Sequence, residues 1–170
     1  MIGPAARRFA LVLHVGASVG WLGAVAVSLA VGVLGLAASD VQVVRGAYLL
    51  LEPLGWWTLI PFSVASLATG LVQSLGTHWG LLRHYWVLIK LGMNVFATGI
   101  LLLYTQTLAV LADTARDPAA GAAQLRNPSP VVHAAGAIVL LLVALVLSIY
   151  KPRGTTAWAT GARTPAGTAA

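Results

Sequence analysis

Residues 9–39 read FALVLHVGASVGWLGAVAVSLAVGVLGLAAS, a run without a single Lys, Arg, Asp or Glu. About 20 apolar residues are enough for a helix to cross the hydrocarbon core of a bilayer. The apolar core of a cleaved signal peptide has only about 7–15 residues, so this run is too long to be one. We therefore interpret it as an uncleaved membrane helix.

The composition of the whole chain supports the same interpretation. Of its 170 residues, 59% are hydrophobic and 8% charged, and the mean hydropathy is +0.88. A soluble domain carries about 25% charged residues, so a soluble enzyme and a disordered chain are excluded. The net charge of +6 comes from scattered residues and not from a basic run, which argues against a nucleic-acid partner. The absence of Cys excludes disulfides and thiolate metal sites.

Three further apolar runs follow the first. Pro53–Leu82 and Asn127–Tyr150 contain no charged residue, and Tyr85–Ala112 contains only Lys90. Lipid cannot satisfy backbone polar groups, so these runs are predicted to be helical. The sequence therefore predicts an all-α integral membrane protein, an antiparallel bundle of four transmembrane helices within one domain of residues 1–151. The predicted helices are 10–36, 53–75, 85–111 and 131–150.

Loop charges predict the orientation, because cytoplasmic loops carry an excess of Lys and Arg. An N-terminus in the cytoplasm places seven Lys and Arg residues on the cytoplasmic side and three on the other, with all four acidic residues outside. Four spans return the C-terminus to the cytoplasm, where residues 152–170 are predicted to form a disordered tail. Residues 113–130, with Asp-Pro, Asn-Pro and Ser-Pro steps, are predicted to be an irregular outer loop.

Polar residues inside the spans are expected to face the bundle, because lipid offers them no partners. Helical spacing and depth sort them into two layers. We predict an inner polar cluster of His14, Gln73, Lys90 and Asn94, and an outer polar cluster of Glu52, Tyr104 and His133. Lys90 has a second interpretation, in which its ammonium group extends to the membrane interface that Tyr85 and Trp86 mark.

Glycines recur along the first predicted helix. Small residues on one helix face allow close helix packing. They therefore indicate either close contacts within the bundle or the docking of a partner protein or a second copy of the chain. The glycines in question are Gly16, Gly20, Gly23, Gly32 and Gly35.

Two short segments resemble known membrane families. Residues 13–23, LHVGASVGWLG, have the form His-x6-Trp-x-Gly, which resembles the first helix of the copper-resistance D proteins and of the HemJ-type protoporphyrinogen oxidases. Residues 85–91, YWVLIKL, are similar to the aromatic-then-Lys-Leu entry into a later helix of these proteins. Over residues 10–154 the chain is similar to an uncharacterised family of four-helix bacterial integral membrane proteins allied to both.

This resemblance implies a protein of the bacterial inner membrane with haem b as cofactor. It assigns His14 as the axial ligand of the haem iron and Lys90 as a propionate or charge partner, while Trp21 would pack on the macrocycle. Two departures limit it. Residues 31–35 lack the polar residues of the HemJ-type proteins, and the two methionines of the chain do not provide the thioether ligands that suit Cu(I).

Three classes of function stay open at this point, and the sequence does not decide whether the protein is an enzyme. The first is a haem- or quinone-linked redox protein. The second is an accessory or structural membrane subunit. The third is a small transport protein without cofactor, similar to a metal exporter, which predicts solvent access to Ser63 and Ser66 from one side.

Overall fold

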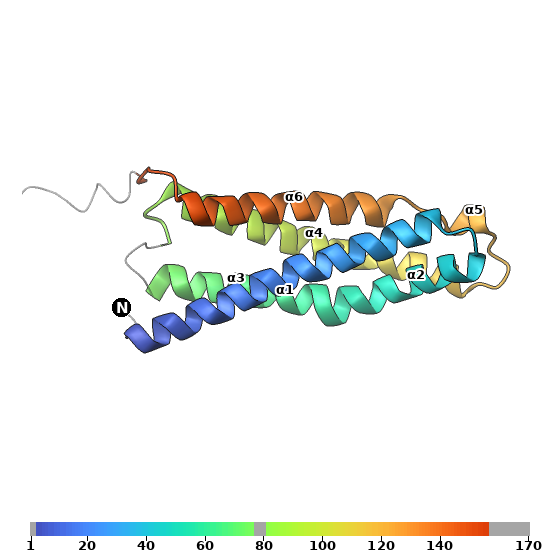
Figure 1. The fold of residues 1–170 in the computed structure, drawn as a ribbon, viewed down its shortest axis with the longest axis horizontal. Coiled ribbons are helices and arrows are strands. Elements are labelled where there is room, and N and C mark those ends of the chain that lie inside the picture. The colour runs from blue at the N-terminus through green and yellow to red at the C-terminus, as the bar shows by residue number, and fades with distance from the viewer. Residues whose placement is uncertain (1–2, 77–80, 157–170) are drawn as a thin grey trace, which may run out of the picture.

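The computed structural model describes residues 3–76 and 81–156, and within these ranges it is all-helical (Figure 1). Four helical segments are long and apolar enough to cross a membrane: Pro4–Ala37, Val41–Gly76, Tyr85–Arg116 and Ala122–Tyr150. The elements are α1 (Pro4–Ala37), α2 (Val41–Leu54), the π-helical turn η1 (Gly55–Leu59), α3 (Ile60–Gly76), α4 (Tyr85–Arg116), α5 (Ala122–Leu125) and α6 (Ser129–Tyr150).

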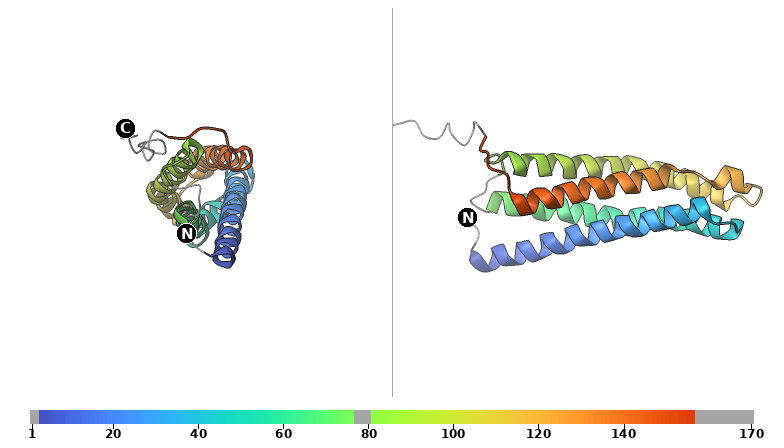
Figure 2. Two further views of the ribbon diagram at one scale, coloured as in Figure 1. Left: turned by 90° about the vertical axis from the view of Figure 1, so that its left-hand side faces the viewer. Right: turned by 45° about the horizontal axis from the view of Figure 1, so that its top comes forward.

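The long helices lie side by side along one axis (Figure 2). Helix α1 packs against α2, α3 and α6, and α4 packs against the same three helices. The end at which α1 begins also holds the end of α3, the beginning of α4 and the end of α6 (Figure 1). We call this the α1-start end; the other end holds α5 and the beginning of α2.

The second span begins earlier than predicted. Asp40 caps α2 by accepting a hydrogen bond of 2.8 Å from the Gln42 backbone N–H, so the connection after α1 is only three residues long. Val44, Ala47, Tyr48 and Leu51 repeat at helical spacing and are buried. The second helix was predicted to begin at residue 53 because the charge-free run begins there, after Arg45 and Glu52.

A π-helical turn interrupts the second span between two prolines. The Ile60 N–H donates to the Gly55 carbonyl, five residues before it. Pro53 and Pro61 lack backbone N–H groups, so neither can donate the regular helical hydrogen bond. The π-helical turn lies between these two positions, and the helix continues directly after it as α3.

The predicted irregular loop 113–130 is partly helical and is hydrogen-bonded to α2. Helix α4 continues to Arg116, and α5 forms a short turn within the connection. The Tyr48 hydroxyl accepts from the Asn127 N–H (2.8 Å) and donates to the Asn127 carbonyl (3.0 Å). The Arg45 guanidinium donates to four backbone carbonyls, those of Ala115, Asp117, Pro118 and Ala120.

The buried core lies in two clusters. One joins α2, α4 and the connection after α4, and it contains Val44, Tyr48, Leu51, Leu108, Leu111, Ala115, Ala120 and Leu125. The other lies nearer the middle and contains Trp21, Ala24, Val25, Leu59 and Ala134. Large apolar residues such as Phe9, Val19 and Leu103 are more than 60% exposed on the outer faces, as in helices that face lipid.

The beginning of the predicted disordered tail contacts the segment before α4. The Thr156 N–H donates to the Arg83 carbonyl (3.1 Å), and its hydroxyl donates to the Leu82 carbonyl. Residues 152–156 therefore lie against the segment that precedes α4, while residues 157–170 lie outside the described residues.

Candidate functional site

His14 joins α1 to α3. Its Nδ1 lies 3.2 Å from the Ser66 carbonyl oxygen and 3.1 Å from the Thr69 hydroxyl oxygen. The carbonyl can only accept, and the Thr69 hydroxyl already donates to the Ala65 carbonyl, so Nδ1 carries the proton and Nε2 keeps its lone pair. The ring packs against Gly70, where an added Cβ would lie 3.1 Å from Cε1 of His14.

A chain of polar contacts extends from this histidine into the bundle. The hydroxyl oxygens of Ser18 and Ser66 lie 2.9 Å apart, and the Asn94 side-chain N–H donates to Ser66 Oγ over 3.4 Å. Three helices, α1, α3 and α4, thus meet at Ser66, which is 2% exposed. Gln73 lies nearer the end of α3 and donates to the Ala10 carbonyl (3.0 Å).

Lys90 does not contact this group. Its ammonium donates to the Ser148 hydroxyl on α6 and lies 5.9 Å from the centre of the Trp86 ring. Of the four residues predicted for the inner cluster, His14 and Asn94 are linked through Ser66, whereas Lys90 faces α6. Ser18, Ser66 and Thr69 were not assigned to this cluster, although all three lie at helical spacing from predicted members.

At the other end, the structure brings Tyr104 and His133 together. Their rings stack with centroids 3.9 Å apart and planes inclined by 19°. The Tyr104 hydroxyl donates to Ser129 Oγ (3.0 Å), and His133 Nδ1 donates to the Ser129 carbonyl (3.0 Å). In this arrangement Nε2 is the ring nitrogen that can offer a lone pair.

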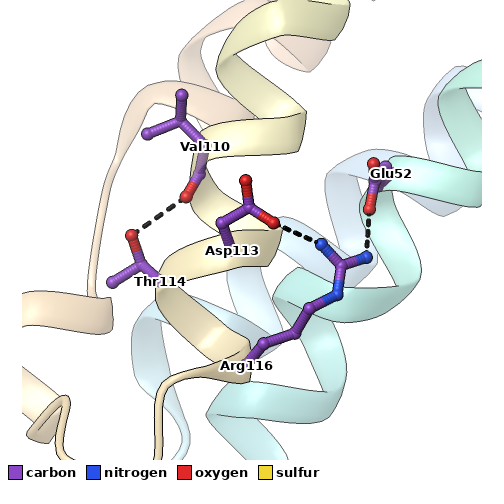
Figure 3. Close-up of polar contacts among 5 residues, drawn as sticks. All are labelled: Glu52, Val110, Asp113, Thr114 and Arg116. Carbon is purple, nitrogen blue, oxygen red and sulfur yellow. Dashed lines mark hydrogen bonds and ion pairs between the residues drawn. The ribbon is translucent and has the colours of Figure 1, made fainter.

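Glu52, the third residue predicted for the outer cluster, pairs with a different partner. Arg116 binds Glu52 and Asp113, each over 2.6 Å, on the exposed outer surface (Figure 3). Arg116 was expected in the loop, but the extension of α4 by one further turn brings its guanidinium next to α2. The outer cluster is therefore the pair Tyr104–His133, with Glu52 in a separate ion pair.

A cavity of about 370 Å³ lies beside Tyr104 and His133. Trp21 and Leu59 bound it toward the middle of the bundle, and small residues of α4 and α6 make room for it. The sequence singled out Trp21, Tyr104 and His133 as candidate site residues, but it did not predict a cavity between them. The small lining residues are Ala97, Ala134, Gly136 and Ala137, and large apolar side chains such as Phe96, Ile100 and Leu101 complete the wall.

The residues predicted to hold haem do not surround one space. Trp21 lines the cavity, but neither His14 nor Lys90 is among its lining residues. His14 packs against α3 and Lys90 reaches α6, so a macrocycle held by all three residues does not fit this arrangement. Among the described residues, no group of three His, Cys, Asp or Glu side chains is placed to hold a metal ion. Haem binding thus stays a prediction from the sequence motifs.

Comparison with protein families, with characterised proteins and with solved structures finds no match to this chain. The family resemblance therefore also stays a prediction. The cavity and the polar groups around it are the features from which a function can be argued.

Proposed function

We propose that this protein spans the bacterial inner membrane as an antiparallel four-helix bundle, with both termini in the cytoplasm, and binds a lipid-soluble small molecule. The observation that carries the proposal is the cavity between α1, α4 and α6. Its walls are almost entirely apolar, as ligand pockets commonly are. A bundle core is also a common place for a bound cofactor.

The entrance to the cavity supports a ligand that arrives through the bilayer. Phe96 and Ile100 of α4 and Val132 of α6 line the cavity and are 61%, 40% and 64% exposed. In a membrane these side chains would face lipid. The cavity therefore opens sideways, between α4 and α6, toward the hydrocarbon phase.

Two polar groups define the chemistry of the ligand. Trp21, which is only 2% exposed, lines the cavity, and its indole N–H is a hydrogen-bond donor. Nε2 of His133 offers an acceptor on the same cavity. A flat ring that carries carbonyl or hydroxyl oxygens would satisfy one or both and would stack on the aromatic walls. A quinone has this chemistry.

Quinone binding can be measured with the purified protein in detergent. A short-chain ubiquinone analogue such as decylubiquinone is titrated into the wild type and into Gly136→Leu, which places a larger side chain on the cavity wall. An added Cβ at Gly136 has nothing within 4 Å, so the first atom of the new side chain meets no neighbouring atom. Ala97→Leu narrows the cavity from α4 and serves as a second variant.

Gly92→Leu is the matched control, because Gly92 is also a helical glycine with open space at Cβ but lies away from the cavity. We expect both cavity variants to weaken binding at least tenfold and the control to bind as the wild type. Equal affinity in all four proteins, or no saturable binding to the wild type, would refute the proposal. An absorption spectrum of the oxidised and reduced protein tests the haem prediction separately.

A second candidate function is that of an accessory subunit that docks through α1. Gly20, Gly32 and Gly35 are covered by other helices, but an added Cβ at Gly16 or Gly23 has nothing within 4 Å. These two glycines lie two turns apart on one exposed face. A double variant, Gly16→Leu with Gly23→Leu, should abolish cross-linking of the protein to itself or to a membrane partner if this face is an interface.

A further inference from the structure

Thr98 has an unusual environment for a hydroxyl group inside a helix. Seven other hydroxyls donate to a carbonyl three or four residues before them: those of Ser28, Ser63, Thr69, Ser74, Thr105, Thr114 and Ser148. The Thr98 hydroxyl makes no such bond. It is buried without any hydrogen-bond partner among the described residues, and Thr98 as a whole is 6% exposed.

Asn94 presents a second unsatisfied atom one helical turn away. Its Oδ1 is buried and has no partner in the described parts of the chain, while its side-chain N–H donates to Ser66 Oγ. Residues four apart share one face of a helix, so both unsatisfied oxygens lie on the same side of α4. A buried polar group without a partner costs about 1–3 kcal/mol, so two neighbouring ones indicate a bound hydrogen-bonding species.

The chemistry of the site favours water over a cation. Asn94 Oδ1 can only accept, and the Thr98 hydroxyl can both accept and donate, so the bound species must donate hydrogen bonds. A cation would need negative charge nearby, but all four acidic residues lie near the opposite end of the bundle, where Glu52 pairs with Arg116. Lys90, one turn before Asn94 on the same helix, adds a positive charge. Water carries no charge and can donate hydrogen bonds to both Asn94 Oδ1 and the Thr98 hydroxyl.

The surrounding residues also indicate the side from which water enters. Polar side chains continue from Ser66 toward the α1-start end, through Thr69, His14 and Gln73. In the other direction Trp21 and Leu59 belong to a buried apolar cluster. We propose that Ser18, Ser66, Asn94 and Thr98 form a hydrated polar site in the middle of the bundle, open to water from the α1-start end and closed toward the other end.

Single-cysteine labelling tests this proposal, because the chain contains no cysteine of its own. Thr98→Cys and Asn94→Cys are exposed, in oriented membrane vesicles, to a charged methanethiosulfonate reagent that does not cross the bilayer. Only a thiol in water ionises to the reactive thiolate. We expect both cysteines to react at least tenfold faster than Val95→Cys, the matched control, since Val95 is 52% exposed on the outer face of the same helix.

Two further variants identify the side of the membrane from which the reagent reacts. Arg83→Cys lies just before α4, at the α1-start end, and Gln124→Cys lies in α5, at the other end; both positions are exposed. Thr98→Cys should react only from the side on which Arg83→Cys reacts. Rates equal to that of Val95→Cys for both buried cysteines, or reaction from the side of Gln124→Cys, would overturn the proposal. Neither result bears on quinone binding, which the titration above measures independently.

Discussion

Replacing Tyr48 with Phe should destabilise the bundle more than the loss of one oxygen atom suggests. Tyr48 is 1% exposed, and its hydroxyl makes two hydrogen bonds with the backbone of Asn127, at 2.8 and 3.0 Å. Each such bond contributes about 0.5–1.5 kcal/mol net, and both Asn127 groups lose this partner in Tyr48→Phe. We expect a loss of about 2 kcal/mol in the free energy of unfolding, a factor of about 30 in the ratio of folded to unfolded protein.

The loss is measured by unfolding the protein in mixed micelles of increasing SDS content and following tryptophan fluorescence. Tyr150→Phe removes the same atom from a tyrosine that is 78% exposed, and it should leave the transition unchanged. The connection after α4 should also become more sensitive to protease in Tyr48→Phe, because Asn127 ties it to α2. Identical transitions for the two variants would refute the idea that this buried hydroxyl fastens the connection.

Two further substitutions test contacts between helices. Gly35→Val should destabilise by about 1–3 kcal/mol in the same unfolding assay, because an added Cβ lies 3.2 Å from both Ala47 Cβ and Tyr48 Cε2; Gly16→Val, with open space at Cβ, is its control. An equal loss of stability in Gly35→Val and Gly16→Val would contradict this packing. Glu52→Gln should barely change the transition, and high salt should have as little effect on the wild type, because the ion pair with Arg116 is exposed. A large shift of the unfolding transition in Glu52→Gln would show that this ion pair holds α2 to α4.

The apolar runs predicted the helical segments because length and hydropathy are properties of the sequence alone. The boundaries were harder, as the second span shows. Arg45 and Glu52 made residues 37–52 resemble a loop, yet both side chains reach partners beyond α2, at the connection after α4 and at Arg116. Only the fold shows that these charges do not interrupt the helix.

Helical spacing and depth predicted that Tyr104 and His133 lie in one layer, and the structure stacks their rings. The same reasoning placed His14 and Lys90 together, but Lys90 bonds to Ser148, whose single hydroxyl does not stand out in the apolar sequence of α6. The cavity could not be predicted, since it depends on how the side chains of several elements meet. The small residues on its walls indicate a cavity only when the fold shows that they face the same space.

The two proposed sites divide the bundle at Trp21. On one side of this residue lie the polar groups around Ser66, and on the other lies the apolar cavity. Ser18 and Trp21 are three residues apart on α1, a rise of about 4.5 Å along the helix axis. Reduction of a bound quinone would take two electrons from a separate donor and two protons, and the proposed hydrated site lies only one helical turn away, behind the apolar side chains of Trp21 and Leu59. If protons pass this apolar layer, the short distance between the two proposed sites favours a redox-linked ligand over a purely structural lipid in the cavity.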